Sequence, residues 1–133
     1  MISSPAVVVH GLLHARQALR GGWPVTLLSA EAAAGYAGCL WWRELVAAAR
    51  AGYPATPVFD VLDCGAAPGH AMAALRAGQR ALVLDPTCPA FQAVASAAGT
   101  LGSVVLPSRP PALDLAAAGA RRRLAGWLVA TAR

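Results

Sequence analysis

The sequence contains no lysine, and all eleven of its basic residues are arginine. This absence excludes Schiff-base chemistry, a lysine general base and the phosphate-binding lysine of P-loop proteins. Charged residues make up only 13% of the chain, roughly half of the usual share, so charge would cover the surface of a monomer poorly. We therefore expect a homo-oligomer that buries one apolar face between its subunits.

Long uninterrupted hydrophobic segments are also missing. The longest candidate, residues 32–49, is interrupted by Arg43 and Glu44, whereas a membrane span needs roughly 18 to 20 uncharged residues. The first residues lack the basic segment that precedes the apolar part of a secretory signal peptide. We therefore predict a cytoplasmic protein without membrane contact.

Cysteine is scarce and shows no metal-binding spacing. Cys39, Cys64 and Cys88 form neither a C-x-x-C pair nor a zinc pattern. An odd number of cysteines in a cytoplasmic chain indicates reduced thiols, of which we expect two to be buried as small apolar side chains. The sequence predicts no metal site.

The arginines are scattered along the chain, apart from the run Arg121–Arg123. A nucleic-acid binder usually gathers its cations on one face, whereas scattered arginines at helix ends fit solvated surfaces. We therefore predict no nucleic-acid partner. Leu124, Trp127 and Leu128 follow the run at helical spacing. An ordinary surface helix accounts for this segment, whereas the alternative, an amphipathic membrane contact, would need more than one such turn.

Short apolar runs alternate with helical patterns along the whole chain, and the apolar runs do not themselves alternate with polar residues. This pattern is typical of parallel strands with helices on both faces. We predict one α/β domain of residues 1–133, a three-layer sandwich with a five-stranded, mainly parallel sheet in flavodoxin-like or similar doubly wound order. The predicted strands are residues 6–10, 25–28, 58–63, 80–85 and 103–106, and the predicted helices are residues 12–19, 31–52, 69–77, 89–98 and 113–132.

Polar side chains collect where the predicted strands end. His10, Asp63, Asp85 and Arg109 each lie at or just beyond the carboxyl end of a strand. In a parallel sheet these ends share one edge, which is where open α/β sheets bind ligands. The sequence therefore predicts a ligand site at this edge.

The most distinctive part of this edge is a glycine-bearing turn between two apolar runs, Asp63-Cys64-Gly65-Ala66-Ala67-Pro68-Gly69. It resembles the first motif of S-adenosylmethionine-dependent methyltransferases, an apolar strand followed by D-x-G-x-x-P-G. The resemblance implies that Gly65 and Gly69 let the backbone approach the methionine part of the cofactor, and that Asp85 holds its ribose hydroxyls. It names S-adenosylmethionine as a possible cofactor.

Other interpretations of the same turn stay open. Asp63 and Gly65 can simply end a strand, with Pro68 at the first position of a helix. The backbone amides of residues 65–70 could instead bind a phosphate with help from Arg109 and His70. Because Asp63 would repel that phosphate, a ligand with hydroxyl groups fits better.

Three side-chain features bear on catalysis and assembly. His10 and His70 are candidate catalytic residues as an acid–base pair, and structural hydrogen-bonded histidines are the alternative. Cys64 is predicted to be a buried, inert thiol, since the adjacent carboxylate disfavours its thiolate. Trp41 and Trp42 point about 100° apart on a helix, so we expect one in the core and the other at a rim or subunit contact.

Three functions are compatible with these observations, and the sequence leaves open whether the protein is an enzyme. The preferred one is an oligomeric binding or structural module with a small-molecule site at the carboxyl edge. A small enzyme using His10, Asp63, His70 and Asp85 is the second, and a methyltransferase-like binder of S-adenosylmethionine is the third. The candidate ligand-binding residues are Asp63, Gly65, Gly69, Asp85 and Arg109.

Overall fold

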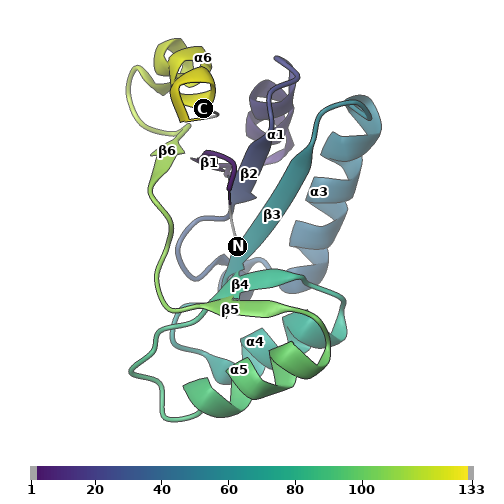
Figure 1. The fold of residues 1–133 in the computed structure, drawn as a ribbon, viewed down its shortest axis with the longest axis vertical. Helices are drawn as coiled ribbons and strands as arrows, with labels where there is room; N and C mark the ends of the chain where they lie inside the picture. Colours follow the sequence, from purple (N-terminus) through teal and green to yellow (C-terminus); the bar gives the residue numbers. More distant parts are fainter. Residues whose placement is uncertain (1–2, 132–133) are drawn as a thin grey trace. The chain divides into compact units, whose positions relative to one another are not determined.

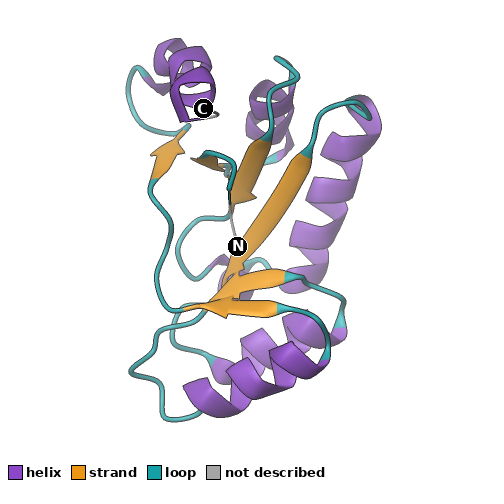
Figure 2. Ribbon diagram, viewed as in Figure 1, coloured by secondary structure: helices purple, strands orange, loops and turns teal. Residues whose placement is uncertain are grey.

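The computed structural model describes residues 3–131, in which strands and helices alternate along most of the chain (Figure 1, Figure 2). Ala132, the last residue of the final predicted helix, lies outside the described residues. The strands are β1 (Ala6–Val8), β2 (Val25–Leu28), β3 (Val58–Asp63), β4 (Ala81–Val83), β5 (Val104–Leu106) and β6 (Ala112–Asp114). The helices are α1 (Leu12–Leu19), α2 (Ala33–Tyr36), α3 (Cys39–Gly52), α4 (Pro68–Arg76), α5 (Phe91–Thr100) and α6 (Ala120–Thr131).

The strands are parallel and follow the hydrogen-bonded order β5-β4-β3-β2-β1-β6. The predicted α/β class, with a parallel sheet flanked by helices, is confirmed, but the described residues hold six strands where five were predicted. A flavodoxin-like order would place the first strand between the second and the third. Here β2 lies between β1 and β3, so the observed order differs from that expectation.

The sixth strand comes from a segment that helical spacing assigned to the last helix. Leu113 pairs with Val7 of β1 and is buried. Asp114 then ends the strand, because its carboxylate accepts the Ala116 N–H in a local turn. Helix α6 begins only after Gly119, whose φ of +74° lies in the region that favours glycine. The apolar pattern there belongs to two elements, and the prediction of one helix over residues 113–132 is wrong.

The long helix predicted over residues 31–52 is also two helices. Gly38 has a φ of +91°, which a right-handed helix does not allow, and it separates α2 from α3. Ala32 at the start of α2 is the only non-glycine residue with positive φ among residues 3–131, at 54°. The segment between β2 and α3 therefore contains the short helix α2 and a turn at Gly38, rather than the start of one long helix.

The chain divides into two compact units. Unit 1 comprises Met1–Leu28, Glu44–Asp60 and Pro110–Arg133, and unit 2 comprises Ser29–Arg43 and Val61–Arg109. Helix α3 and strand β3 each contribute residues to both units. That residues 1–133 fold as a single domain stays a prediction.

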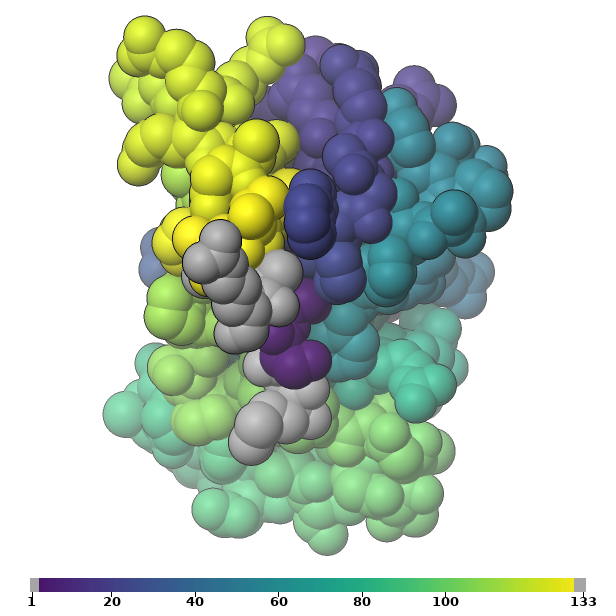
Figure 3. All heavy atoms as spheres, turned by 45° about the horizontal axis from the view of Figure 1, so that its top comes forward, coloured from purple at the N-terminus to yellow at the C-terminus, as the bar shows by residue number. Residues whose placement is uncertain are grey.

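In unit 1, β1 pairs with β2 on one side and with β6 on the other. Helix α1 packs on β2 and α6 packs on β6. The indole N–H of Trp127 donates to the carbonyl of Ala6 over 2.8 Å, which ties α6 to β1. Arg121–Arg123 are exposed, as expected for a solvated helix surface, and α6 forms the yellow part of the surface in Figure 3.

In unit 2, β4 pairs with the end of β3 and with β5. Helices α4 and α5 lie side by side, and α5 packs on β5 (Figure 1). Leu62, Leu82 and Trp42 are fully buried in its core. Trp41 is 36% exposed, which confirms that one indole of the Trp41–Trp42 pair is in the core and the other at the surface.

No helix within residues 3–131 combines the length and the apolar character needed to cross a bilayer.

The core of unit 2 provides a direct stability test. Leu62→Ala should lower the free energy of unfolding by about 2–5 kcal/mol, because it leaves a cavity at a fully buried position. Leu101→Ala removes the same atoms from a side chain that is 58% exposed and should change it by about 0.5 kcal/mol or less. Chemical denaturation of both variants measures the difference, and equal effects would contradict the packing described here.

Candidate functional site

A pocket of about 420 Å³ lies in unit 2 at the carboxyl ends of β3, β4 and β5. It follows from the parallel pairing, which brings the segments after these three strands to one edge. Three carboxylates and one guanidinium face it, together with small and apolar residues. Its lining consists of Glu31, Ala32, Asp63, Gly65, Ala66, Val83, Asp85, Pro86, Pro107, Ser108 and Arg109.

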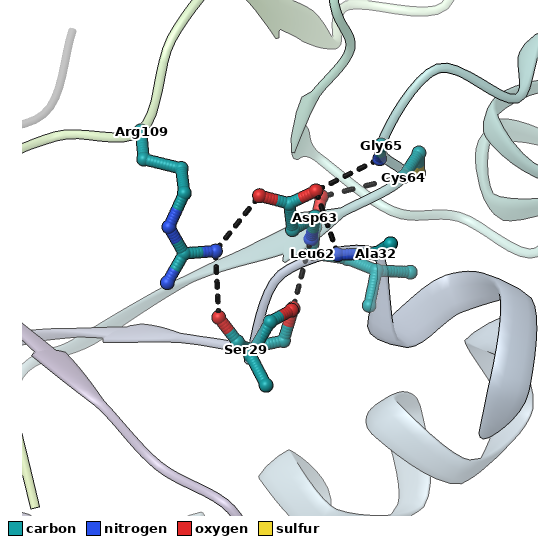
Figure 4. A network of polar contacts seen from close by, with 8 residues as sticks. Ser29, Ala32, Leu62, Asp63, Cys64, Gly65 and Arg109 are labelled. Atoms are coloured by element: carbon teal, nitrogen blue, oxygen red, sulfur yellow. Dashed lines mark hydrogen bonds and ion pairs between the residues drawn. The ribbon is translucent and has the colours of Figure 1, made fainter.

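The Asp63 carboxylate is the best-connected group at this edge (Figure 4). Its Oδ1 accepts the N–H of Ala32 at 3.0 Å and the N–H of Gly65 at 2.8 Å. Its Oδ2 accepts a guanidinium N–H of Arg109 at 2.7 Å. Asp63 is only 2% exposed, so these bonds replace the water that a buried carboxylate would otherwise need.

Ser29 completes the network around Asp63 from the end of β2. Its Oγ accepts the backbone N–H of Asp63 at 2.9 Å. Its carbonyl oxygen accepts a 3.0 Å hydrogen bond from Arg109 Nη1, the same nitrogen that donates to Asp63. Figure 4 shows the guanidinium reaching both groups from the segment after β5. Ser29, Asp63 and Arg109 therefore hold together the segments that follow β2, β3 and β5.

The turn after β3 requires glycine at position 65. Gly65 has a φ of +58°, and a Cβ placed there would lie 3.0 Å from the Cβ of Ala32. Both the backbone conformation and the space therefore exclude a larger residue without a shift of the turn. The close approach lets the Ala32 and Gly65 amides reach the same carboxylate oxygen. Gly65 thus serves the turn around Asp63.

Asp85, after β4, forms a separate local motif. Its Oδ1 accepts the backbone N–H of Thr87 at 2.9 Å and the Thr87 hydroxyl at 2.8 Å. These two hydrogen bonds lower the pKa of Asp85, against a small opposing effect of burial, so it is a carboxylate at neutral pH. Its Oδ2 accepts no hydrogen bond from the described residues.

The predicted ligand-binding residues are brought together only in part. Asp63, Gly65, Asp85 and Arg109 line one pocket, as their places at strand ends suggested. Gly69 lies in the first turn of α4, is exposed and is not part of the lining. Whether the four lining residues bind a ligand stays a prediction.

The two candidate catalytic histidines have different surroundings. His70 is exposed on α4, and its imidazole lies against Gly35 of α2 rather than in the pocket. His10 belongs to unit 1, where its Nε2 lies 2.8 Å from Asp114 Oδ1 and its backbone N–H donates to His14 Nδ1. The sequence analysis missed both partners of His10. The four-residue spacing of His10 and His14 was a usable signal, whereas Asp114 was hidden by the assignment of its segment to a helix.

Cys64 lies beside the pocket but has no nucleophilic character. Burial raises the pKa of its thiol to about 12, with further contributions from the charges of Asp63 and Cys39. The thiol donates a weak hydrogen bond to the carbonyl of Leu62. At neutral pH it is protonated, in agreement with the inert thiol expected from the sequence.

Within residues 3–131, no group of three histidine, cysteine, aspartate or glutamate side chains could hold a metal ion. Comparison of the sequence with protein-family models and with curated proteins gives no match. The function of the pocket is therefore inferred from its own groups. Glu31 and Asp85 offer carboxylate oxygens to a ligand, Ser108 offers a hydroxyl and Arg109 offers its remaining guanidinium N–H groups.

The Asp63–Arg109 ion pair can be tested with a variant that keeps most of the carboxylate's geometry. Asp63→Asn retains an oxygen for the two backbone amides but removes the charge that Arg109 faces. We expect a loss of about 3 kcal/mol in the free energy of unfolding, because removing one partner of a buried pair leaves the other unpaired. Thermal and chemical denaturation measure the effect.

Arg43→Gln is the matched control. Arg43 is exposed and makes only a long, 3.4 Å hydrogen bond to the carbonyl of Ala77, so its replacement should cost about 0.5 kcal/mol or less. A cost for Asp63→Asn no larger than that of the control would show that the pair does not hold the edge together.

Proposed function

We propose that this chain is an oligomeric binding module whose pocket in unit 2 takes a small molecule with vicinal hydroxyl groups, such as the ribose of a nucleoside. The observation that carries the proposal is Asp85. Asp85 lines the pocket as an ionised group. One of its oxygens accepts two hydrogen bonds from Thr87, and the other has no protein partner among the described residues. Hydroxyl donors form strong, charge-assisted hydrogen bonds to such an oxygen.

The rest of the pocket supports a ligand with a flat apolar part. Ala66, Val83, Pro86 and Pro107 line it alongside the polar groups. Small-molecule sites typically combine apolar walls with a few polar groups that fix orientation. Ser108 and the outer nitrogens of Arg109 supply further donors at the same edge. A free phosphate is disfavoured by the three carboxylates that line the pocket.

Binding rather than catalysis is favoured because none of the candidate reactive groups in unit 2 is suited to act on a ligand in the pocket. Asp63 accepts three hydrogen bonds and is almost fully buried, so it positions the edge and cannot act on a ligand without losing them. The thiol of Cys64 is protonated, and His70 lies outside the pocket lining. Asp63, Cys64 and His70 therefore offer no general base to the pocket, and the lowered pKa of Asp85 makes its carboxylate a weak one.

S-adenosylmethionine is a second candidate ligand on one specific observation. Strands β3 and β4 are adjacent, and Gly65 and Asp85 at their ends line the same pocket, as the resemblance to the methyltransferase motif implies. Gly69 lies outside the lining, and two strand–helix units precede the motif, so methyl transfer is not part of the proposal. The cofactor enters as one of several ribose-bearing ligands to be tested.

Isothermal titration with adenosine tests the role of Asp85. Asp85→Asn keeps the oxygen that Thr87 binds but replaces the acceptor facing the pocket. We expect it to weaken adenosine binding about 10-fold or more, the loss of a hydrogen bond to a charged group. The wild-type chain should bind 2′-deoxyadenosine more weakly than adenosine by a similar factor. The variant should bind the two nucleosides with equal affinity.

Glu44→Gln is the control for charge, since Glu44 is an exposed carboxylate outside the pocket lining. It should leave the affinity unchanged within about 2-fold. Titration of the wild-type chain with S-adenosylmethionine separates the two candidate ligands. Absence of heat with all three compounds at millimolar concentration, or equal binding by Asp85→Asn and the wild type, would contradict the proposed site.

The oligomer in this proposal is supported by an exposed apolar cluster in unit 2. Tyr36 is 72%, Leu40 56% and Trp41 36% exposed, and they lie within six residues of sequence. Aromatic residues at a protein surface are enriched in subunit contacts. The low share of charged residues also favours an oligomer.

We include location in the cytoplasm in the same proposal. It is supported by the three cysteines, which are all free thiols.

Sedimentation velocity tests the oligomer. The wild-type chain should sediment with at least twice the 13.5 kDa mass of one chain. Leu40→Glu should shift it toward the monomer, because a charge in an apolar contact is costly to desolvate. Leu13→Glu, at a side chain that is 65% exposed in unit 1, is the control and should leave the mass unchanged. A wild-type monomer would refute this part of the proposal.

A further inference from the structure

Two of the three histidines of the chain lie together in unit 1 with one carboxylate. The histidine cluster consists of His10 just after β1, His14 in α1 and Asp114 at the end of β6. The two imidazole rings lie 5.6 Å apart at 83°, an edge-to-face arrangement. None of the three residues belongs to unit 2, so the cluster is independent of the pocket described above.

The cluster occupies a distinctive place in the strand order of unit 1. From β1 the chain passes to β2 on one side, and it later returns to β6 on the other side. The carboxyl ends of β1 and β6 therefore meet where the direction of strand addition reverses. In open α/β sheets this reversal point is where ligands usually bind, because the connections leave the two strand ends in opposite directions.

One ring nitrogen of His10 is hydrogen-bonded to a carboxylate, which determines where the imidazole carries its proton. Its Nε2 lies 2.8 Å from Asp114 Oδ1, and the same oxygen accepts the Ala116 N–H at 2.9 Å. The carboxylate holds the imidazole proton on Nε2, so Nδ1 carries the lone pair. No hydrogen bond from the described residues occupies Nδ1. The side chains of His10 and Asp114 are 36% and 45% exposed, which leaves them open to a substrate.

The imidazole of His14 accepts a hydrogen bond through its Nδ1 and carries its proton on Nε2. Its Nδ1 accepts the backbone N–H of His10 at 3.1 Å, so its own proton sits on Nε2. Burial lowers the pKa of His14, the neighbouring His10 lowers it further, and Asp114 opposes both. His14 therefore stays neutral at neutral pH and adds no positive charge beside His10.

The pKa of Asp114 is lowered overall. Burial by itself raises this pKa, but the hydrogen bond from the Ala116 N–H and the hydrogen bond and charge of His10 outweigh that effect. The charge of His14 contributes least. Asp114 is therefore ionised at neutral pH. Among the elements around His10, α1 contains His14 and Arg16, β6 contains Asp114, and β1 and β2 contain no ionisable side chain.

We propose that the histidine cluster is an acyl-transfer site, in which His10 Nδ1 attacks small activated esters. A bond forms between Nδ1 and the acyl carbon, and the bond from that carbon to the ester oxygen breaks, so the alcohol leaves as its anion. The acylated ring is positively charged, and the Asp114 carboxylate on Nε2 stabilises that charge. Water then attacks the acyl carbon and the bond from that carbon to Nδ1 breaks, which releases a carboxylic acid and restores neutral His10. One proton of the water goes to the solvent, where it balances the charge of the alcohol anion that left first. Asp114 is the positioning residue of this pair.

Hydrolysis of p-nitrophenyl acetate by the full chain tests the proposal. His10→Gln should lower the protein-dependent rate at pH 7 by about 10-fold or more, the usual range for a group that acts in the reaction. His70→Gln removes an exposed histidine that lies outside the cluster and should leave the rate unchanged. A similar loss in both variants, or no loss in His10→Gln, overturns the proposal.

The pH profile tests the part played by Asp114. Removing the carboxylate in Asp114→Asn destabilises the charged imidazole, so the pH of half-maximal rate should move to lower values and the plateau rate should fall. A merely structural role would lower the rate without moving this pH, and an unmoved midpoint overturns the role given to Asp114. Circular dichroism of each variant confirms that it is folded.

A measurement on the wild-type chain needs no variant to fold. Acid quenching during turnover, followed by peptide mass spectrometry, should find the acetyl group on His10. An acetyl group found on His70, on the amino terminus or nowhere in the chain overturns the proposal. Titration with adenosine separates the two sites: it should leave the esterase rate unchanged, and the esterase can fail while the binding proposed for unit 2 stands, or the reverse.

Discussion

The hydrogen bonding of the Asp63 carboxylate is the constraint on which the rest of unit 2 depends. A buried carboxylate is costly unless its oxygens are satisfied, and here two amides and one guanidinium satisfy them. Each donor lies on a different segment. The positive φ of Gly65 and Ala32 brings the two amides close enough to share one oxygen. The shape of the pocket thus follows from the solvation of one charge.

The two aspartates at the ends of β3 and β4 have different roles in this arrangement. Asp63 and Asp85 follow neighbouring strands and resemble each other in sequence context, yet the first is enclosed and the second keeps an outward oxygen. The difference arises from their partners. Asp63 receives Arg109 and two turn amides, whereas Asp85 receives only its near neighbour Thr87. A pair of acids in a motif can therefore hold one ligand-facing group and one structural group.

Much of the fold was predictable because the strands are short, apolar runs bounded by turn residues. Asp63, Gly65, Asp85 and Arg109 line one pocket because parallel pairing alone brings strand ends together, whereas Gly69 lies outside its lining. The sixth strand was missed because Ala112–Asp114 is too short to show a period of its own. The strand order and the pairing of His10 with Asp114 depend on contacts between distant segments, which spacing along the chain does not encode.

The way the two units are composed has a consequence for synthesis on the ribosome. Unit 2 ends at Arg109, so all its residues have been made before β6 exists. Unit 1 contains the first strand but needs β6 and α6 to cover β1. During translation one hydrogen-bonding edge of β1 therefore stays unpaired until β6 has been made, at a time when all residues of unit 2 are already present. An exposed strand edge is prone to wrong pairing, and the brevity of β1, three residues long, limits that hazard.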